Sequence, residues 1–337
     1  MSITPRPTTA GRAALLGLAA LVLAACGASG TSDETTTTPT ATAGSATTDP
    51  AAVIPIRIGT LPIVATSALW YGVDKGIFTE HGLDVTVDTG VGSETMVAAA
   101  LAHEVDFVTL NSVSLMVALD AGVPVQVASG FSQAWADGEE DISAVLTKPD
   151  SGITDAAGLA GHTIAVNTLN SAGTLTISEA VRAAGGDPEK IQFVEIRYPD
   201  MIRALEAGDV DAIWEVEPFI TIAQGNGAQV ASWNFAESAP GLSTQVMVTA
   251  ADQDPEVVDR FTAALTDVLK AAEADQDGLR QVLVDKLEMD PALAERVRMD
   301  RFSTEINMDA LRSLAGLAHA EGLVSKPVDL AAFEKKG

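Results

Sequence analysis

Two glutamates near the middle of the chain are the clearest candidates for chemistry. Glu215 and Glu217 flank Val216 at the end of an expected strand, so both should project to one face of it. A carboxylate pair can act as general acid and general base, but nothing in the neighbouring sequence distinguishes the two. The pair is interpreted either as acceptors of hydrogen bonds from an amine or an aminopyrimidine, or as solvated charges of an acidic protein.

The motifs of common enzymes are missing from the sequence. It has no G-x-S-x-G elbow, P-loop or H-E-x-x-H zinc motif, and its four histidines are scattered over expected turns. The run from Gly90 to Thr95 (GVGSET) opens a helix after a strand, but it lacks the third glycine of a dinucleotide-binding fingerprint. We therefore expect a backbone cradle for a small group at this turn. We expect neither catalysis nor a cofactor nor a bound metal.

Small polar residues follow most of the expected strands. In open parallel sheets, ligands bind beyond the carboxyl ends of the strands, where hydroxyls, amides and free N–H groups can hold a polar group. Taken singly, each such residue is better explained as a helix cap or turn residue, but their convergence on one space favours a binding site. Four aromatic residues in or beside these segments can stack on a flat ligand or pack in the core. They are Trp70, Tyr71, Trp135 and Trp214.

Strand-like and helix-like segments alternate along the chain, which predicts an α/β protein with mainly parallel strands. Residues 99–108 (AALAHEVDFV) echo residues 204–213 (ALEAGDVDAI), and the tripeptide Leu-Asn-Ser occurs at 110–112 and at 169–171. These echoes favour two duplicated lobes with a cleft between them. The expected strands are 56–60, 83–88, 105–110, 125–129, 163–167, 192–196, 210–214, 229–231 and 245–249. The expected helices are 67–78, 93–102, 112–121, 172–184, 199–207 and 217–224, with more after Asp254-Pro255 and Asp290-Pro291.

The chain is strongly acidic, with 20 Lys and Arg against 46 Asp and Glu and a net charge of −26. Loss of residues 1–25, which contain two arginines and no acid, would lower this charge to −28. Nucleic acids and anionic lipid surfaces are bound through clustered Lys and Arg. The composition therefore argues against both as partners.

The only cysteine, Cys26, closes an N-terminal segment that has the parts of an export signal. Arg6 and Arg12 form a basic start, and residues 13–25 form an apolar stretch too short to span a bilayer. The run Leu23-Ala24-Ala25-Cys26 resembles the lipobox of bacterial lipoproteins, in which the cysteine takes a diacylglycerol thioether. We expect a signal peptide over 1–25 and a lipidated Cys26 in a flexible tether over 26–53, anchored to the outer face of the cytoplasmic membrane. A plain secretory peptide with an incidental thiol is the alternative.

The folded part resembles the ABC-transporter substrate-binding proteins of the nitrate, sulfonate, taurine and thiamine-pyrimidine group. The resemblance covers about residues 54–250. The stretches that carry it most clearly are 58–60 (IGT), 68–78 (ALWYGVDKGIF), 81–85 (HGLDV), 155–166 (DAAGLAGHTIAV) and 207–219 (AGDVDAIWEVEPF).

The resemblance implies a type II periplasmic-binding-protein fold, in which two α/β lobes close on a small-molecule ligand. Crossings near Thr147 and Thr244 would give a discontinuous first lobe (54–146 and 246–337) and a second lobe (147–245). The resemblance also implies delivery of a sulfonate, nitrate or pyrimidine-type solute to an ABC permease and its ATPase, and we expect a monomer. The cysteine-rich motif of eukaryotic relatives that make a thiamine pyrimidine is missing here. The implied pocket residues are Trp70, Ser93, Asn111, Ser112, Ser171, Ala172, Trp214 and Glu217.

Two other functions stay open at this point. One is an envelope enzyme that acts on a similar small molecule, and the other is a sensory lipoprotein with no role in transport.

Overall fold

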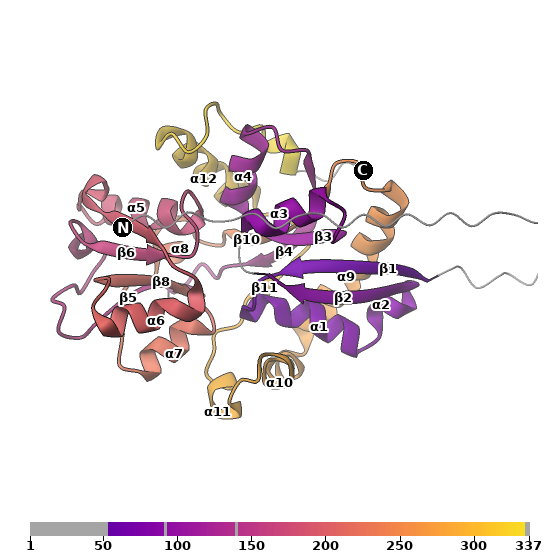
Figure 1. Ribbon diagram of the computed structural model, residues 1–337, viewed down its shortest axis with the longest axis horizontal. Coiled ribbons are helices and arrows are strands. Elements are labelled where there is room, and N and C mark those ends of the chain that lie inside the picture. The colour runs from indigo at the N-terminus through magenta and orange to yellow at the C-terminus, as the bar shows by residue number, and fades with distance from the viewer. Residues whose placement is uncertain (1–52, 91–92, 139–140, 334–337) are drawn as a thin grey trace, which may run out of the picture. The chain divides into compact units, whose positions relative to one another are not determined.

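The computed structural model describes residues 53–90, 93–138 and 141–333. These residues form two mixed β-sheets with helices packed on them (Figure 1). The expected signal peptide, Cys26 and almost all of the tether lie outside the described residues. In the described part of the chain, no helix is both long enough and apolar enough to cross a membrane.

The first sheet has six strands in the order β11-β4-β10-β3-β1-β2. β1 is parallel to β2 and β3, whereas β10 is antiparallel to β3 and β4. The strands are β1 (Ile54–Thr60), β2 (Leu83–Thr89), β3 (Phe107–Asn111), β4 (Val125–Gln133), β10 (Ser243–Ala250) and β11 (Arg301–Phe302). The helices between the first four of them are η1 (Val64–Thr66), α1 (Ser67–Asp74), α2 (Ile77–Glu80), α3 (Ser93–Leu101) and α4 (Ser112–Asp120).

The second sheet has five strands in the order β7-β6-β8-β5-β9. β6 is parallel to β7 and β8, whereas β5 is antiparallel to β8 and neighbours β9. The strands are β5 (Ser143–Thr147), β6 (Thr163–Val166), β7 (Gln192–Glu195), β8 (Ala212–Val216) and β9 (Gln229–Ser232). The helices are η3 (Ala157–Leu159), α5 (Ala172–Ala183), η4 (Pro188–Lys190), α6 (Tyr198–Ala207), α7 (Phe219–Gly225) and α8 (Asn234–Ser238).

The two sheets repeat one plan. In each, three parallel strands lie in the order second, first, third, and the next strand is an antiparallel one that directly follows a crossing between the sheets: β2-β1-β3-β10 and β7-β6-β8-β5. The echo between residues 99–108 and 204–213 falls at equivalent places, since the segments lead from α3 into β3 and from α6 into β8. The two Leu-Asn-Ser tripeptides do not, because the first begins within the end of β3 and the second comes after β6.

The chain passes from the first sheet to the second over residues 134–142 and returns over residues 233–242. Residues 143–146, expected in the first lobe, therefore pair in the second sheet as part of β5. No strand was expected there. All five residues of β5 are buried, so the segment lacks the polar–apolar alternation that reveals a half-buried strand.

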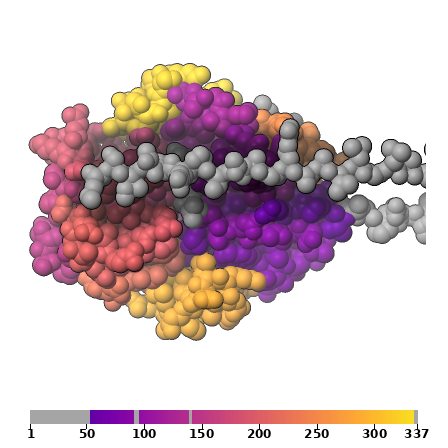
Figure 2. All heavy atoms as spheres, viewed as in Figure 1, coloured from indigo at the N-terminus to yellow at the C-terminus, as the bar shows by residue number. Residues whose placement is uncertain are grey.

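The C-terminal segment is mostly helical and returns to the first sheet. Asp254 and Asp290 each accept a backbone N–H from two residues ahead, next to a proline in the first turn, as the sequence predicted. α9 and α10 pack against α1, and α12 packs against α4 and α5; Figure 2 shows α12 (yellow) lying along the segment of α4. The elements are α9 (Pro255–Ala274), α10 (Gln276–Leu287), α11 (Pro291–Ala294), α12 (Met308–Ala320) and η5 (Leu330–Phe333).

Candidate ligand-binding site

A small cavity lies where the carboxyl ends of strands from both sheets meet. Leu61 follows β1, Asn111 ends β3, Asn167 follows β6 and Glu217 follows β8, and all four line the cavity. Because β1 matches β6 and β3 matches β8 in the repeated plan, each lobe contributes the same two strand ends. The remaining lining residues are Ile63, Ala65, Ile142, Ala172, Tyr198, Trp214, Val216, Phe235, Thr244, Gln245 and Asp300.

The cavity has a volume of about 30 Å³. One water needs roughly 10–15 Å³ measured in this way, so the cavity has room for one or two waters. An organic molecule cannot enter it unless the lobes separate. We refer to this space as the site cavity.

One wall of the site cavity is aromatic. The ring centroids of Tyr198 and Trp214 lie 5.9 Å apart, and those of Trp214 and Phe235 lie 6.2 Å apart. The Trp214 Nε1–H donates to Ser143 Oγ at 2.8 Å, which fixes the indole between β8 and β5. Gly173 in α5 lets the helix approach the indole, since a Cβ there would lie 2.4 Å from Trp214 Cε3.

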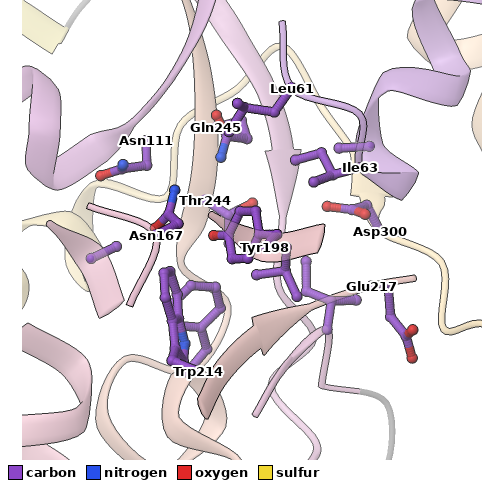
Figure 3. A pocket seen from close by; sticks show the side chains of 15 residues that line it. Leu61, Ile63, Asn111, Asn167, Tyr198, Trp214, Glu217, Thr244, Gln245 and Asp300 are labelled. Carbon is purple, nitrogen blue, oxygen red and sulfur yellow. The ribbon is translucent and has the colours of Figure 1, made fainter. Parts of the chain in front are cut away.

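Two asparagines line the site cavity, one from each lobe (Figure 3). Asn111 caps α4: its Oδ1 accepts the Ser114 N–H and its Nδ2 donates to Ser114 Oγ, both at 2.8 Å. Asn167 Oδ1 is buried and has no hydrogen-bond partner among the described residues. A buried unpaired acceptor costs free energy, which a ligand that donates a hydrogen bond would recover.

Asp300 is the acid that points into the site cavity (Figure 3). It is 4% exposed. Burial raises its pKa to about 7; the charge of Glu217 adds to this rise, and a hydrogen bond from Ser132 opposes it. No Lys or Arg is among the described lining residues. The electrostatics therefore favour a neutral or positively charged group and disfavour an anion.

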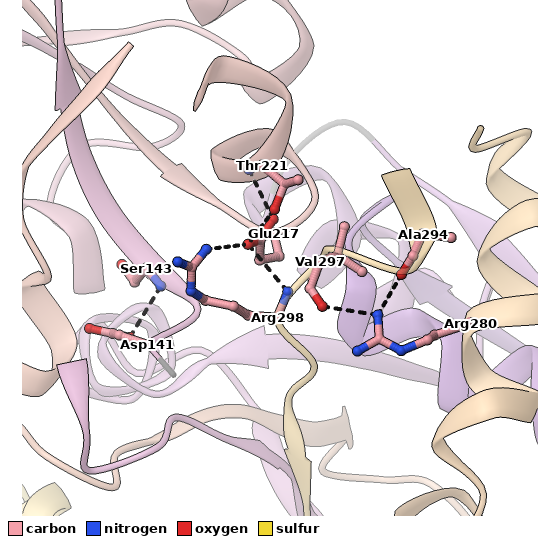
Figure 4. Close-up of polar contacts among 8 residues, drawn as sticks. All are labelled: Asp141, Ser143, Glu217, Thr221, Arg280, Ala294, Val297 and Arg298. Carbon is pink, nitrogen blue, oxygen red and sulfur yellow. Dashed lines mark hydrogen bonds and ion pairs between the residues drawn. The ribbon is translucent and has the colours of Figure 1, made fainter. Parts of the chain in front are cut away.

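The Glu217 carboxylate points away from the centre of the site cavity toward Arg298 (Figures 3 and 4). Its Oε1 accepts from Thr221 Oγ1 at 2.8 Å and lies 3.2 Å from Arg298 Nη1, and its Oε2 accepts the Thr221 N–H. Its backbone oxygen accepts the Val64 N–H at 3.1 Å. Burial raises the pKa of Glu217, and Thr221 and Arg298 oppose that rise. Glu217 thus joins the second lobe to η1 and to the C-terminal segment.

A family model described as NMT1/THI5 like matches residues 65–278, more than half of the chain. The chain belongs to the NMT1/THI5-like family. No curated protein matches the chain.

Solved structures share the fold of this NMT1/THI5-like chain. The alkanesulfonate-binding protein SsuA from Xanthomonas axonopodis pv. citri bound to MOPS is 18% identical, over 83% of this chain and 98% of that one, with a TM-score of 0.70. The aliphatic sulphonate binding protein SsuA from Escherichia coli is 16% identical, over 82% and 91%, with a TM-score of 0.66. The nitrate-binding protein NrtA from Synechocystis PCC 6803 is 10% identical, over 83% and 85%, with a TM-score of 0.70. The predicted family and the predicted periplasmic-binding-protein fold with two α/β lobes are confirmed.

The residues that the family resemblance assigned to the pocket fall into two groups. Asn111, Ala172, Trp214 and Glu217 line the site cavity. The others described in full do not. Trp70 is half-buried on α1, Ser112 Oγ donates to the Ser243 carbonyl, and Ser171 precedes α5 with its Oγ donating to the Thr168 carbonyl at 2.7 Å. Ser93 begins α3, and its side chain lies outside the described part of the structure.

The two glutamates do not share a face. β8 ends at Val216, so strand alternation no longer applies to Glu217, which leads into α7 instead. Trp214 and Val216 line the site cavity, whereas Glu215 projects from the other side of β8. Glu215 is fully buried, both of its carboxyl oxygens lack a hydrogen-bond partner in the described structure, and burial raises its pKa well above the usual value.

Several residues that line the site cavity were not predicted from the sequence. Asn167 ends an expected strand, so the strand-end rule alone could have found it. Tyr198 lies in one of the polar segments that follow the strands. No sequence pattern indicated that Asp300 lines a site, because it lies between two short elements, α11 and β11, in a segment expected to be helical.

Proposed function

We propose that this chain is the substrate-binding component of an ABC importer. The family, the fold and the convergence of four strand ends on one cavity between the lobes support this function. Ligand contact with both lobes would stabilise the closed form, and the permease and its ATPase would respond to that form. The chain would act as a monomer and without catalysis.

Export and lipid anchoring belong to the same proposal. A binding protein outside the cell needs to stay beside its permease, and the lipobox-like run ending at Cys26 offers a covalent anchor. In a bacterial host fed radiolabelled palmitate, the chain should take up label and stay with membranes, and the Cys26→Ser variant should do neither. Label on the Cys26→Ser variant would contradict the anchor.

We infer that the ligand carries a nitrogen group that donates hydrogen bonds, either a small amine or a nitrogen heterocycle. The observation that carries this inference is the Asp300 carboxyl, buried in a site cavity that has no basic residue among its described lining. A sulfonate or a nitrate presents only acceptors and a negative charge, and would meet Asp300 and the unpaired Asn167 Oδ1 unfavourably. The Tyr198 and Trp214 rings add faces that attract a cation.

Calorimetric titration of the purified protein tests the ligand class. Primary amines and aminopyrimidines should bind, and alkanesulfonates and nitrate should not. An Asp300→Asn change should weaken amine binding at least tenfold, because hydrogen bonds to a charged group contribute about 1.5–3 kcal/mol. The exposed Asp309→Asn variant is the matched control and should bind as the wild type does.

Measuring amine binding at several pH values tests the same proposal further. Because the Asp300 pKa is raised to about 7, amine binding should weaken as the pH falls from 8 to 5 and the carboxyl takes up a proton. Tight binding of a sulfonate or of nitrate, without binding of any amine, would overturn the proposed ligand class.

A further inference from the structure

A second pocket, which we call the apolar pocket, lies beside the site cavity. Its volume is about 370 Å³, within the range of small-molecule sites. Aliphatic side chains form most of its wall: Val97 and Leu101 on α3, Val117 on α4, and Leu169 in the connection after β6. The first three belong to the first lobe and Leu169 to the second.

The apolar pocket gathers hydrophobic side chains that are unusually exposed for this chain. The large hydrophobic residues with the highest exposure in the described structure are Val53 at 58%, Leu169 at 41% and Leu101 at 36%. Two of these three come from different lobes and line the same pocket. Apolar surface in contact with water is unfavourable, so a ligand that covers these leucines gains free energy.

Neighbouring residues line the apolar pocket and the site cavity. Asn111 lines the site cavity, whereas its neighbour Leu110 and its hydrogen-bond partner Ser114 line the apolar pocket. On the second lobe, Asn167 lines the site cavity and Thr168 lines the apolar pocket. A ligand that reaches both amides from the site cavity therefore has the apolar pocket beside it.

The volumes of the two spaces indicate which part of a ligand each of them can hold. The site cavity, at about 30 Å³, holds a group of one or two heavy atoms, whereas the apolar pocket, at about 370 Å³, holds most of a small organic molecule. We propose that the ligand is amphiphilic, with a small nitrogen head in the site cavity at Asp300 and an apolar tail in the apolar pocket. This inference rests on the proposed function and narrows its ligand class.

The tail also explains how the ligand could hold the lobes together. It would touch α3 and α4 on one side and the 168–170 connection on the other, and so would bridge the two lobes. The head in the site cavity also touches both lobes, and the tail adds to those contacts.

Calorimetric titration with ethylamine, butylamine, hexylamine and octylamine at pH 8 tests the proposal. Each added methylene should tighten binding up to about fourfold until the apolar pocket is filled. Ethylamine affinity equal to octylamine affinity would overturn the inference and leave the proposed amine binding intact. Failure of all four amines to bind would overturn both.

Substitutions in the apolar pocket provide a second test of the proposal. A Leu101→Ser/Leu169→Ser double variant should bind octylamine at least fivefold more weakly and bind ethylamine as the wild type does, which also shows that it folds. Val53→Ser, at the exposed hydrophobic residue outside the pocket, should change neither affinity. If the double variant folds poorly, the single Leu169→Ser variant, changed in an exposed connection, replaces it in the octylamine titration. An unchanged octylamine affinity in the double variant and in the single Leu169→Ser variant would overturn the proposal.

Discussion

Three of the buried carboxyls near the junction of the lobes differ in what surrounds them. Glu217 has an arginine and two donors from Thr221, Asp300 faces the site cavity, and Glu215 has no hydrogen-bond partner among the described residues. A buried carboxyl without partners is destabilising even when it is protonated, because its polar atoms lose their hydrogen bonds to water. Glu217 joins elements and Asp300 faces ligand, but Glu215 makes no contact that explains its presence.

The first prediction follows from Glu215. Glu215→Met should raise the free energy of unfolding by about 1–3 kcal/mol, because an apolar side chain of similar length has no donors or acceptors to satisfy. Urea denaturation followed by circular dichroism measures the change. Glu217→Met is the matched comparison and should lower stability, since it removes the carboxylate that accepts two hydrogen bonds from Thr221 and pairs with Arg298. Loss of stability in the Glu215→Met variant would show that this carboxyl has a stabilising role.

At the scale of elements, the sequence predicted most of what positions the site. The parallel strands that end at the site cavity were expected because their polar ends interrupt apolar runs, and the Asp254 and Asp290 caps were expected from the prolines that follow them. β5 was missed because its burial is uniform, and β11 because two residues give no pattern. Asp300 was missed because its place depends on the return of the C-terminal segment, which is a tertiary contact.

The second prediction concerns the packing of α5 on β8. Gly173→Ala would place a methyl group 2.4 Å from the Trp214 ring, and neither the helix backbone nor the buried indole can move freely. We expect a loss of about 1–3 kcal/mol of stability and weaker ligand binding, because the indole forms a wall of the site cavity. Thermal unfolding and calorimetric titration measure the two effects.

Gly225, at the end of α7, provides the control for this substitution. An added Cβ meets nothing within 4 Å there, so Gly225→Ala should keep or slightly raise stability and leave binding unchanged. Equal effects of the two substitutions would contradict the proposed contact between α5 and Trp214.

The whole molecule combines a large negative charge with acids buried near both crossings between the sheets. Asp141 accepts the Ser143 and Ala236 N–H groups, at 3.1 and 2.8 Å, and so joins the first crossing to α8. Burial raises the pKa values of Asp141 and Asp300 to about 7. Both carboxyls therefore bind protons more tightly in the folded chain than in the unfolded chain, where an Asp pKa is about 3.9.

The third prediction is a stability that falls as the pH rises. Between about pH 4 and pH 7 the folded state binds more protons at Asp141 and Asp300, so their stabilising contribution is complete below pH 4 and is lost as the pH rises through 7. Reduced repulsion among the acidic side chains at lower pH acts in the same direction. The ligand-free protein should unfold at a higher urea concentration at pH 5 than at pH 8. The upper limit is on the order of 4 kcal/mol for each carboxyl.

The slope of stability against pH separates these two carboxyls from the rest of the acidic surface. An Asp141→Asn/Asp300→Asn double variant should have a flatter slope between pH 5 and pH 8, whatever its absolute stability, because its buried amides do not titrate in that range. Asp309→Asn, at an exposed position, should keep the wild-type slope. If the double variant lost stability between pH 5 and pH 8 as steeply as the wild type, Asp141 and Asp300 would not set the pH dependence of the molecule, and the buried Glu215 and Glu217 or repulsion among surface charges would set it instead.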